Sequence, residues 1–125
     1  EEILDSVRMM PLAGYKVSEL SHGNQRKLEV ALLIALDPLV YMFDEPTAGM
    51  SVDEAPVVLD LIARLKAQTD RTILLVEHKM DVIRSLADRI VVLHNGALAA
   101  DGAPAEVMAS DVVQEAYMGK ELDIA

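Results

Sequence analysis

The sequence predicts an α/β fold built on parallel strands joined by a crossover helix. Two short apolar runs, Leu39 to Phe43 and Thr72 to Val76, are typical of strands covered on both faces. Between them, a helix through about Ala67 has one apolar face, formed by Val58, Leu61, Ile62 and Leu65. A strand, a helix and a second strand in this order predict parallel pairing.

The chain before the first strand predicts a short helix and a loop, followed by a longer helix. Ile3, Leu4 and Val7 lie at helical spacing, and Pro11 and Gly14 then break the pattern. Residues 1 to 19 should therefore hold one short helix and a loop.

Ser21 is a candidate N-cap for the longer helix, which we expect from about His22 to Leu36. Asp37-Pro38 should end it, because the residue before a proline disfavours helical geometry. From Val30 onward the helix is apolar on every side, which predicts deep burial.

After the first strand, Pro46 to Val52 is predicted to be a loop. On the following helix, Asp60 and Arg64 should form an exposed pair one turn apart. Met80 to Ala87 is predicted to be helical, beyond the second strand.

The C-terminal part predicts a β-hairpin and two short helices. Arg89 to Leu93 and Ala97 to Ala100 should pair around His94-Asn95-Gly96, because Asn-Gly accepts the positive φ angles of a tight turn. The helices are expected near Pro104 to Met108 and Val112 to Tyr117.

Composition excludes several classes of function. The 125 residues fit one domain with its own core, and 11 basic against 21 acidic residues give a net charge of −10. Such a charge disfavours binding to nucleic acid or anionic lipid. The absence of cysteine excludes disulfides and thiolate metal sites. The longest apolar run, Val30 to Leu36, is far shorter than the roughly 20 residues that span a bilayer.

Several other residue types are given structural interpretations. His22 and His94 are expected in exposed loops, and the three histidines have no ligand-like spacing, so we reject a zinc site. Met9, Met10 and Met42 are interpreted as core residues that fill gaps. The acid pairs Glu1-Glu2 and Asp53-Glu54 are interpreted as solvated faces or helix starts. The apolar fraction of 52% is high for so charged a chain, so some apolar surface should be covered by a partner.

Two segments carry the chemistry. Leu20 to Gln25 forms a Ser/Gly-containing turn that opens a helix, where free backbone N–H groups and the helix dipole favour a phosphate. Asp44-Glu45 ends a strand, where two acids can hold a metal ion and orient a water for phosphoryl transfer. Together they resemble half of an ATP site.

The other half of such a site is missing from the sequence. No stretch matches G-x-x-x-x-G-K-[S/T], the loop whose backbone holds nucleotide phosphates, and Gly14-Tyr15-Lys16 does not replace it. The sequence begins with Glu1 rather than Met, which agrees with a truncated protein. We therefore expect no ATP turnover from these 125 residues alone.

Each motif also has a purely structural interpretation. Ser21 and Gly23 could form only a helix cap, Asp44-Glu45 could be a solvated strand end, and His78 could be a surface histidine. The order of the motifs along the chain favours the functional interpretation.

Over nearly its whole length, the sequence resembles the C-terminal half of an ABC-transporter nucleotide-binding subunit. Leu20 to Gln25 is similar to the ABC signature, Val40 to Asp44 to the Walker B strand, Thr47 to Ser51 to the D-loop and His78 to the switch histidine. Three segments are similar to the branched-chain amino acid and urea importers, namely Asp44 to Gly49, Glu77 to Met80 and Glu115 to Gly119.

The resemblance implies a partial P-loop-NTPase-like fold. Residues 1–22 would be the end of a helical subdomain with the signature loop, and residues 23–125 the C-terminal part of the ATPase core. It also implies roles for individual residues. Asp44 would hold Mg²⁺ through water, Glu45 would polarise the attacking water, and His78 would contact the γ-phosphate or that water.

By the same resemblance, Ser21, Gly23 and Gln25 would contact ATP held by a second ATP-binding subunit. Ala48, Gly49, Met50 and Ser51 would form the D-loop, although the family favours Asp where Ser51 stands. His22 departs from the family's usual Gly.

The implied protein is an ATP-hydrolysing subunit of an importer at the cytoplasmic face of the membrane. Its partners would be a second such subunit, transmembrane permease subunits and, indirectly, a solute-binding protein, with no nucleic acid. Two alternatives remain open at this stage. One is a non-transport ABC ATPase, which would usually show a coiled-coil insertion, and the other is a non-catalytic oligomerisation module that associates through an exposed sheet edge.

Overall fold

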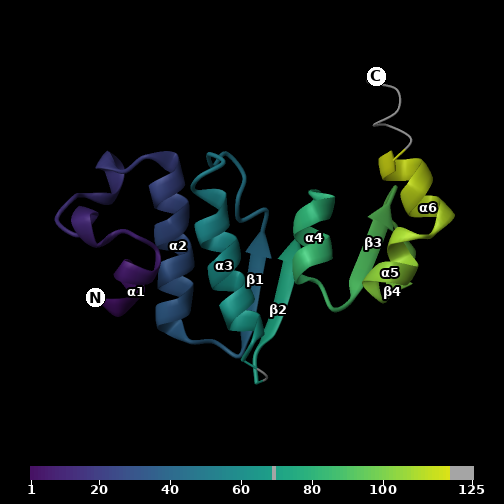
Figure 1. The fold of residues 1–125 in the computed structure, drawn as a ribbon, viewed down its shortest axis with the longest axis horizontal. Coiled ribbons are helices and arrows are strands. Elements are labelled where there is room, and N and C mark those ends of the chain that lie inside the picture. Colours follow the sequence, from purple (N-terminus) through teal and green to yellow (C-terminus); the bar gives the residue numbers. More distant parts are fainter. Residues whose placement is uncertain (69, 119–125) are drawn as a thin grey trace. The chain divides into compact units, whose positions relative to one another are not determined.

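The structure is a computed structural model that describes residues 1–68 and 70–118 (Figure 1). Gly119 of the predicted C-terminal motif, and the end of the predicted 23–125 segment, lie outside the described residues. Contacts group the chain into two compact units, residues 1–78 and residues 79–125, rather than the single domain that its length predicts. Each unit is described by itself.

Unit 1 contains a parallel strand pair joined by a helix, as predicted (Figure 1). Strand β1, Val40–Asp44, pairs with β2, Thr72–Val76, so that Val40 lies opposite Thr72 and Asp44 opposite Val76. Helix α3, Ala55–Lys66, connects them and buries the four predicted residues of its apolar face. The parallel register brings the carboxyl ends of both strands to one edge of the sheet.

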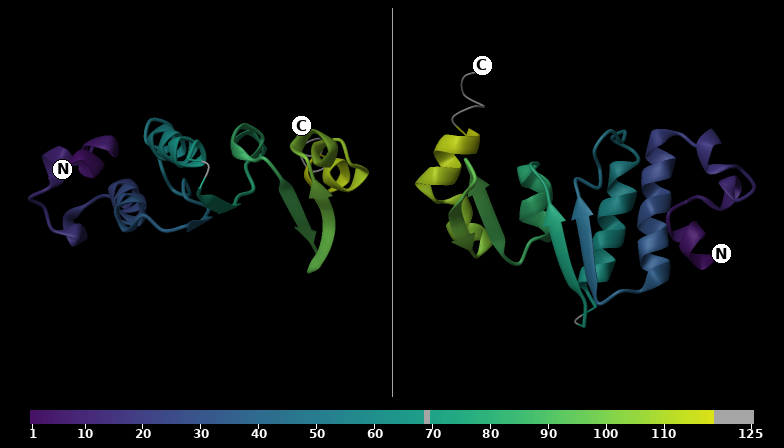
Figure 2. Two further views of the ribbon diagram at one scale, coloured as in Figure 1. Left: turned by 90° about the horizontal axis from the view of Figure 1, so that it is seen from below. Right: turned by 180° about the vertical axis from the view of Figure 1, so that it is seen from behind.

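The prediction that both strands are covered on two faces is wrong. Tyr41 and Phe43 are buried, and their rings stack with centroids 6.1 Å apart. Helix α3 covers one side of the two strands (Figure 2). The side chains of the opposite face are more than half exposed, namely Val40, Met42, Leu74 and Val76. The apolar runs therefore contain the residues for two buried faces, but the described part of unit 1 covers only one.

Helices α1, Glu2–Ser6, and α2, His22–Leu36, confirm the predicted N-terminal helices. The loop between them holds two 3₁₀ turns, η1 at Met10–Leu12 and η2 at Val17–Glu19. Helix α2 ends before Asp37, which has a φ of +46° and so leaves helical geometry.

The deep burial predicted for α2 from Val30 onward is wrong. Val30 and Ala31 are buried, but Leu32 and Leu36 are 57% and 75% exposed. The face that carries these leucines has no packing partner in the described part of unit 1. The core positions predicted for Met10 and Met42 are also wrong, since these side chains are 37% and 67% exposed, whereas Met9 is buried as predicted.

Unit 2 is a hairpin packed against short helices. Strands β3, Ile90–His94, and β4, Ala97–Gly102, are antiparallel, and Asn95 and Gly96 turn between them with φ angles of +50° and +76°. This confirms the predicted Asn-Gly hairpin. The other elements are α4 at Met80–Leu86, α5 at Pro104–Met108, α6 at Asp111–Val113 and a π-helical turn, η3, at Gln114–Met118.

The core of unit 2 consists of Ile90, Val92, Val107 and Val113. Arg89 and Asp101 close the hairpin with two short hydrogen bonds, Nε to Oδ1 at 2.7 Å and Nη2 to Oδ2 at 2.6 Å. His94 ends β3 and His22 begins α2, so both histidines are exposed as predicted but neither lies in a loop. Among the described residues, no helix combines the length and the apolar character needed to cross a bilayer.

Candidate nucleotide site

Ser21 caps α2 as the sequence predicts. Its backbone is extended, with φ −61° and ψ 158°, and its Oγ accepts the backbone N–H of Asn24 at 3.3 Å. This bond satisfies one of the donors that a helix leaves unpaired at its N-terminus. Ser21 is exposed, so the start of α2 is accessible to an anion from solvent.

Gln25 is engaged within the same segment. Its Nε2 donates to the backbone oxygens of Val17 and Leu20, at 3.2 and 3.3 Å. These bonds hold turn η2 against the first turn of α2. In this structure Gln25 therefore positions the loop in front of Ser21.

Asp44 and Glu45 lie at the carboxyl edge of the parallel pair. Asp44 is the exposed last residue of β1, and the backbone N–H of Glu45 donates to the carbonyl of Val76 on β2 at 2.9 Å. Glu45 has a φ of +44°, an uncommon angle for a residue other than glycine. Strained residues concentrate at functional sites, and ligands of open α/β folds bind at this edge.

His78 and Glu45 meet at this edge. His78 Nδ1 lies 2.8 Å from Glu45 Oε1, although the two residues are far apart in the sequence. Glu77, between β2 and His78, accepts a hydrogen bond from Thr47 Oγ1 at 3.4 Å and another from the backbone N–H of His78 at 3.1 Å. Two side-chain contacts therefore join the loop after β1 to the residues that follow β2, one from Glu45 to His78 and one from Thr47 to Glu77.

The chemistry of this edge fits a hydrated magnesium ion. Mg²⁺ keeps most of its waters and is bound by one or two carboxylates together with phosphate oxygens. Asp44 offers an exposed carboxylate for that purpose, next to the carboxylate of Glu45. The described residues contain no cluster of three or more acidic, histidine or cysteine ligands, so a cage made of protein groups alone is not available.

The loop after Glu45 reaches the start of α2. It forms successive turns in which the N–H of Ala48 donates to Glu45 and that of Met50 to Thr47. Gly49 has a φ of +72°, and a Cβ placed there would lie 3.0 Å from the His22 ring. The predicted D-loop and signature turn are therefore adjacent, although within the described residues no hydrogen bond or ion pair joins Ser21 to Glu45.

Sequence analysis missed Lys27 and the carboxylate of Glu54. Glu54 Oε2 accepts the backbone N–H and the hydroxyl of Ser51, at 3.2 and 3.1 Å, and its Oε1 lies 3.6 Å from Lys27 Nζ. The hydrogen bonds from Ser51, and then the charge of Lys27, hold the pKa of Glu54 below its usual value. Glu54 begins α3, as the helix-start interpretation predicts, but its carboxylate is committed to partners. The one local signal was a lysine one turn after Gly23, but Lys27 lies in the polar first half of α2 and does not stand out there.

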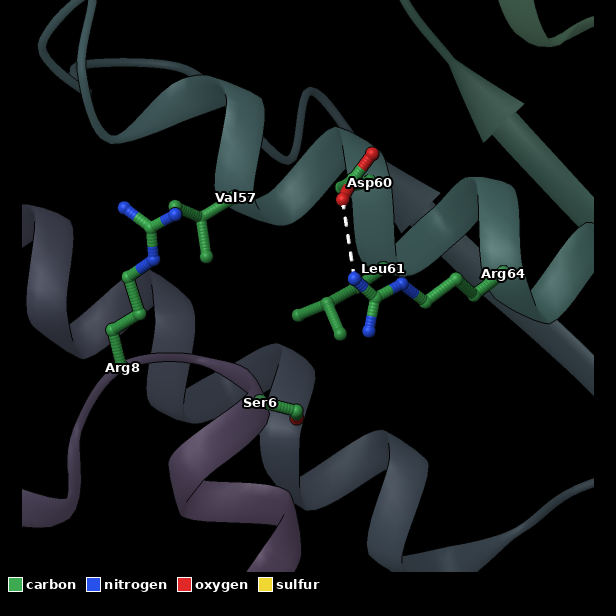
Figure 3. A pocket seen from close by; sticks show the side chains of 6 residues that line it. All are labelled: Ser6, Arg8, Val57, Asp60, Leu61 and Arg64. Atoms are coloured by element: carbon green, nitrogen blue, oxygen red, sulfur yellow. Dashed lines mark hydrogen bonds and ion pairs between the residues drawn. The ribbon is translucent and has the colours of Figure 1, made fainter.

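A separate small cavity lies away from these residues (Figure 3). It measures about 70 Å³ and is lined by Ser6, Arg8, Val57, Asp60, Leu61 and Arg64. Arg64 turns toward Asp60, with Nη2 3.3 Å from Oδ2, which confirms the predicted pair. Ligand pockets usually measure about 300 Å³ or more, so this cavity does not compete with the sheet edge as a nucleotide site.

Comparison with known proteins agrees with the geometry. A family model described as ABC transporter matches residues 1–48. The crystal structure of the ADP conformation of MJ1267, an ATP-binding cassette of an ABC transporter, matches with a TM-score of 0.76 at 29% identity. The match covers 94% of this chain and 48% of that one. The chain therefore has the mixed α/β fold of an ABC ATPase cassette, and it spans about half the length of the MJ1267 structure.

Two curated ATP-binding proteins illustrate the relationship. BraF of Pseudomonas aeruginosa, a high-affinity branched-chain amino acid transport ATP-binding protein, is 37% identical over 117 residues, which are 94% of this chain and 46% of BraF. MetN of Caulobacter vibrioides, a methionine import ATP-binding protein, is 34% identical over an alignment of 126 positions that covers 98% of this chain and 38% of MetN. The chain thus spans less than half the length of either relative.

Proposed function

We propose that the chain acts in the ATP-binding and ATP-hydrolysing subunit of an ABC importer. The contact between Glu45 and His78 at the carboxyl edge of the parallel strands carries the proposal. A carboxylate held by an adjacent imidazole, beside a second exposed carboxylate, suits the activation of water next to a metal-bound phosphate. ATPases with this cassette use ATP and Mg²⁺, which agrees with the acids present.

Each group at the edge has a distinct role in this proposal. Glu45 accepts a proton from the attacking water. The water oxygen bonds to the γ-phosphorus as the bond from that phosphorus to the leaving ADP oxygen breaks. His78 orients Glu45 and can donate to a phosphate oxygen. Asp44 would hold a hydrated Mg²⁺, which would neutralise charge on the outer phosphates.

A second surface of the same unit would serve ATP bound by a partner subunit. The Ser21 hydroxyl and the backbone at Gly23 would approach its γ-phosphate, with Gln25 behind them. Ala48, Gly49, Met50 and Ser51 would lie at the subunit boundary. The exposure of Ser21 and the closeness of Gly49 to His22 support this arrangement.

Branched-chain amino acids or related solutes are the proposed cargo. BraF supports this choice, although MetN has nearly the same identity and a different named solute, so the choice depends on the branched-chain-like motifs. The subunit would lie on the cytoplasmic face of the membrane, bound to permease subunits and to a second ATP-binding subunit, with a solute-binding protein as an indirect partner. A non-transport ABC ATPase is the less favoured alternative.

Hydrolysis in a completed cassette tests the proposed catalytic role. The chain would be combined with a half-cassette that carries G-x-x-x-x-G-K-[S/T], and phosphate release from MgATP would be measured. Glu45→Gln should lower the rate by about 10²- to 10⁴-fold, the usual contribution of a general base. Asp60→Asn, which removes a carboxylate from α3 away from the sheet edge, should leave the rate unchanged. Equal rates for Glu45→Gln and the unmodified protein would refute the assignment.

The chain alone should show no steady turnover, because its 125 residues contain no phosphate loop. Steady phosphate release from the chain alone that disappears in Glu45→Gln would overturn this expectation. The same preparation tests the alternative of an oligomerisation module, which the exposed apolar face of β1 and β2 favours. A well-defined oligomer in light scattering that is indifferent to nucleotide would support that module.

A further inference from the structure

The carboxylate of Glu54 connects two segments that lie far apart in the sequence. One is the turn at 47–51, whose last residue, Ser51, donates two hydrogen bonds to Glu54 Oε2. The other is the first part of α2, from which Lys27 reaches to 3.6 Å from Glu54 Oε1. A single side chain is thus shared between the two segments.

Lys27 is not an ordinary surface lysine. Only 8% of the residue is exposed, and its Nζ also donates to Asn24 Oδ1 at 3.2 Å. An ammonium group that has lost most of its water needs charged or polar partners, because an unpaired buried charge is strongly unfavourable. Glu54 and Asn24 supply them, so the position of Glu54 is tied to the stability of α2.

Gly23 leaves the space that Glu54 fills. A Cβ built on Gly23 would lie 2.7 Å from both Cδ and Oε1 of Glu54, and closer still to Oε2. Any larger residue at position 23 would therefore displace the carboxylate. The absence of a side chain at Gly23 thus leaves room for an intramolecular contact, whether or not a phosphate ever approaches.

A second contact joins the same two segments. The ring of His22 lies against Gly49, where an added Cβ would be 3.0 Å from Cδ2 and 3.1 Å from Nε2. Gly49 also has a positive φ, which a larger residue would adopt only with strain. The start of α2 and the turn at 47–51 are therefore connected in two places, through Glu54 and directly between His22 and Gly49.

We propose that Lys27 and Glu54 are positioning residues that hold residues 21–27 and residues 47–51 together as one unit. The contacts that connect these two segments are present without nucleotide. Its consequence for ATP rests on the proposed function: the Ser21 turn and the D-loop would meet a partner subunit as one preformed surface, and a displacement of either would move the other.

Amide hydrogen exchange of the nucleotide-free chain, followed by NMR, tests this connection. Lys27→Met removes the charge that holds the Glu54 carboxylate in place. The hydrogen bond from the Ser51 N–H to that carboxylate should weaken, and the exchange rate of this N–H should rise by about tenfold. Glu54→Gln should do the same, and the double variant should be no faster than either single one. Lys27→Arg, which keeps the charge, should restore slow exchange.

Gly23→Ala tests the same connection independently, so the test does not require the Lys27→Met variant to fold. It should accelerate exchange at Ser51 in the unmodified chain, because the methyl group displaces Glu54. In a Glu54→Ala background, where no carboxylate remains to be displaced, the same change should have no further effect at Ser51. The matched control is Arg64→Met with Asp60→Asn, an exposed pair on α3 whose removal should leave Ser51 unaffected.

Unchanged exchange at Ser51 in both Lys27→Met and Gly23→Ala would overturn the proposed connection. The connection would also be overturned if Gly23→Ala changed exchange at Ser51 equally in the unmodified chain and in the Glu54→Ala background. These measurements contain no nucleotide, so they are independent of the hydrolysis assay. A cassette that keeps the connection but is indifferent to Glu45→Gln would refute the proposed function alone.

Discussion

Ser21 has two separable roles at the residue scale, a structural cap and a proposed phosphate contact. As a cap it accepts the N–H of Asn24, so Ser21→Ala should lower the free energy of unfolding by about 1 kcal/mol. Ser21→Asp keeps a capping oxygen and should retain most of that stability. Urea unfolding of the two variants checks this, and equal losses of stability would contradict the capping role.

Asp101 should make unit 2 sensitive to acid. The hydrogen bonds and charge of Arg89 hold the pKa of Asp101 below its ordinary value of 3.8. A lowered pKa in the folded state means that the unfolded chain binds the proton more readily. The contribution of this pair is therefore fully present above about pH 3.8 and is lost as the pH falls through the lower folded-state pKa.

Asp101→Asn tests this pH dependence. Chemical unfolding, followed by circular dichroism between neutral and acidic pH, should show a shallower loss of stability in the variant. Asp111→Asn removes an exposed carboxylate elsewhere in unit 2 and should keep the original slope. An Asp101→Asn protein with an unchanged acid slope would show that the pair does not contribute.

At the element scale, the two faces of β1 should respond differently to substitution. Met42 is 67% exposed, so Met42→Lys should change the free energy of unfolding by no more than about 0.5 kcal/mol and should reduce self-association of the chain. Phe43 is 5% exposed and stacks on Tyr41, so Phe43→Ala should cost about 3 kcal/mol or more. Light scattering and denaturant unfolding measure the two effects. A large loss of stability in Met42→Lys would mean that this face is covered.

The positions of the elements could largely be predicted from local sequence. Ser21 marks the start of α2 because a hydroxyl cap is a local interaction, and Asn95-Gly96 marks the hairpin because the turn needs positive φ at both residues. Burial could not be predicted equally well. The apolar character of Val40 and Leu32 shows that they can be buried, but not that a partner is present.

The candidate site could be predicted only in part, for a similar reason. Asp44, Glu45 and His78 follow strands whose parallel pairing was predictable, and the carboxyl ends of parallel strands share one edge. The contact of Lys27 with Glu54 joins residues on different helices, and no local pattern specifies such a pairing. The resemblance implies that Gly23 contacts ATP, and no local pattern indicated that Glu54 would fill the space beside it.

At the scale of the whole molecule, the open apolar face and the missing phosphate loop belong together. The chain spans 46% of BraF, and its apolar fraction of 52% includes a sheet face that the described residues leave exposed. Both features agree with the proposed ATP-binding subunit, in which further polypeptide would supply the phosphate loop and cover the sheet. The two proposed nucleotide surfaces, at Ser21 and at Glu45, would then serve different ATP molecules.

Mixing two inactive variants tests this division most directly. In the completed cassette, Glu45→Gln removes the base, and Ser21→Asp keeps the helix cap but places a negative charge against the γ-phosphate. Each variant alone should be inactive in phosphate release. In a mixed dimer, one site would combine an intact Glu45 with an intact Ser21 from the other subunit. An equal mixture should therefore regain about a quarter of the unmodified rate. A mixture that stays as inactive as its two components would contradict the account.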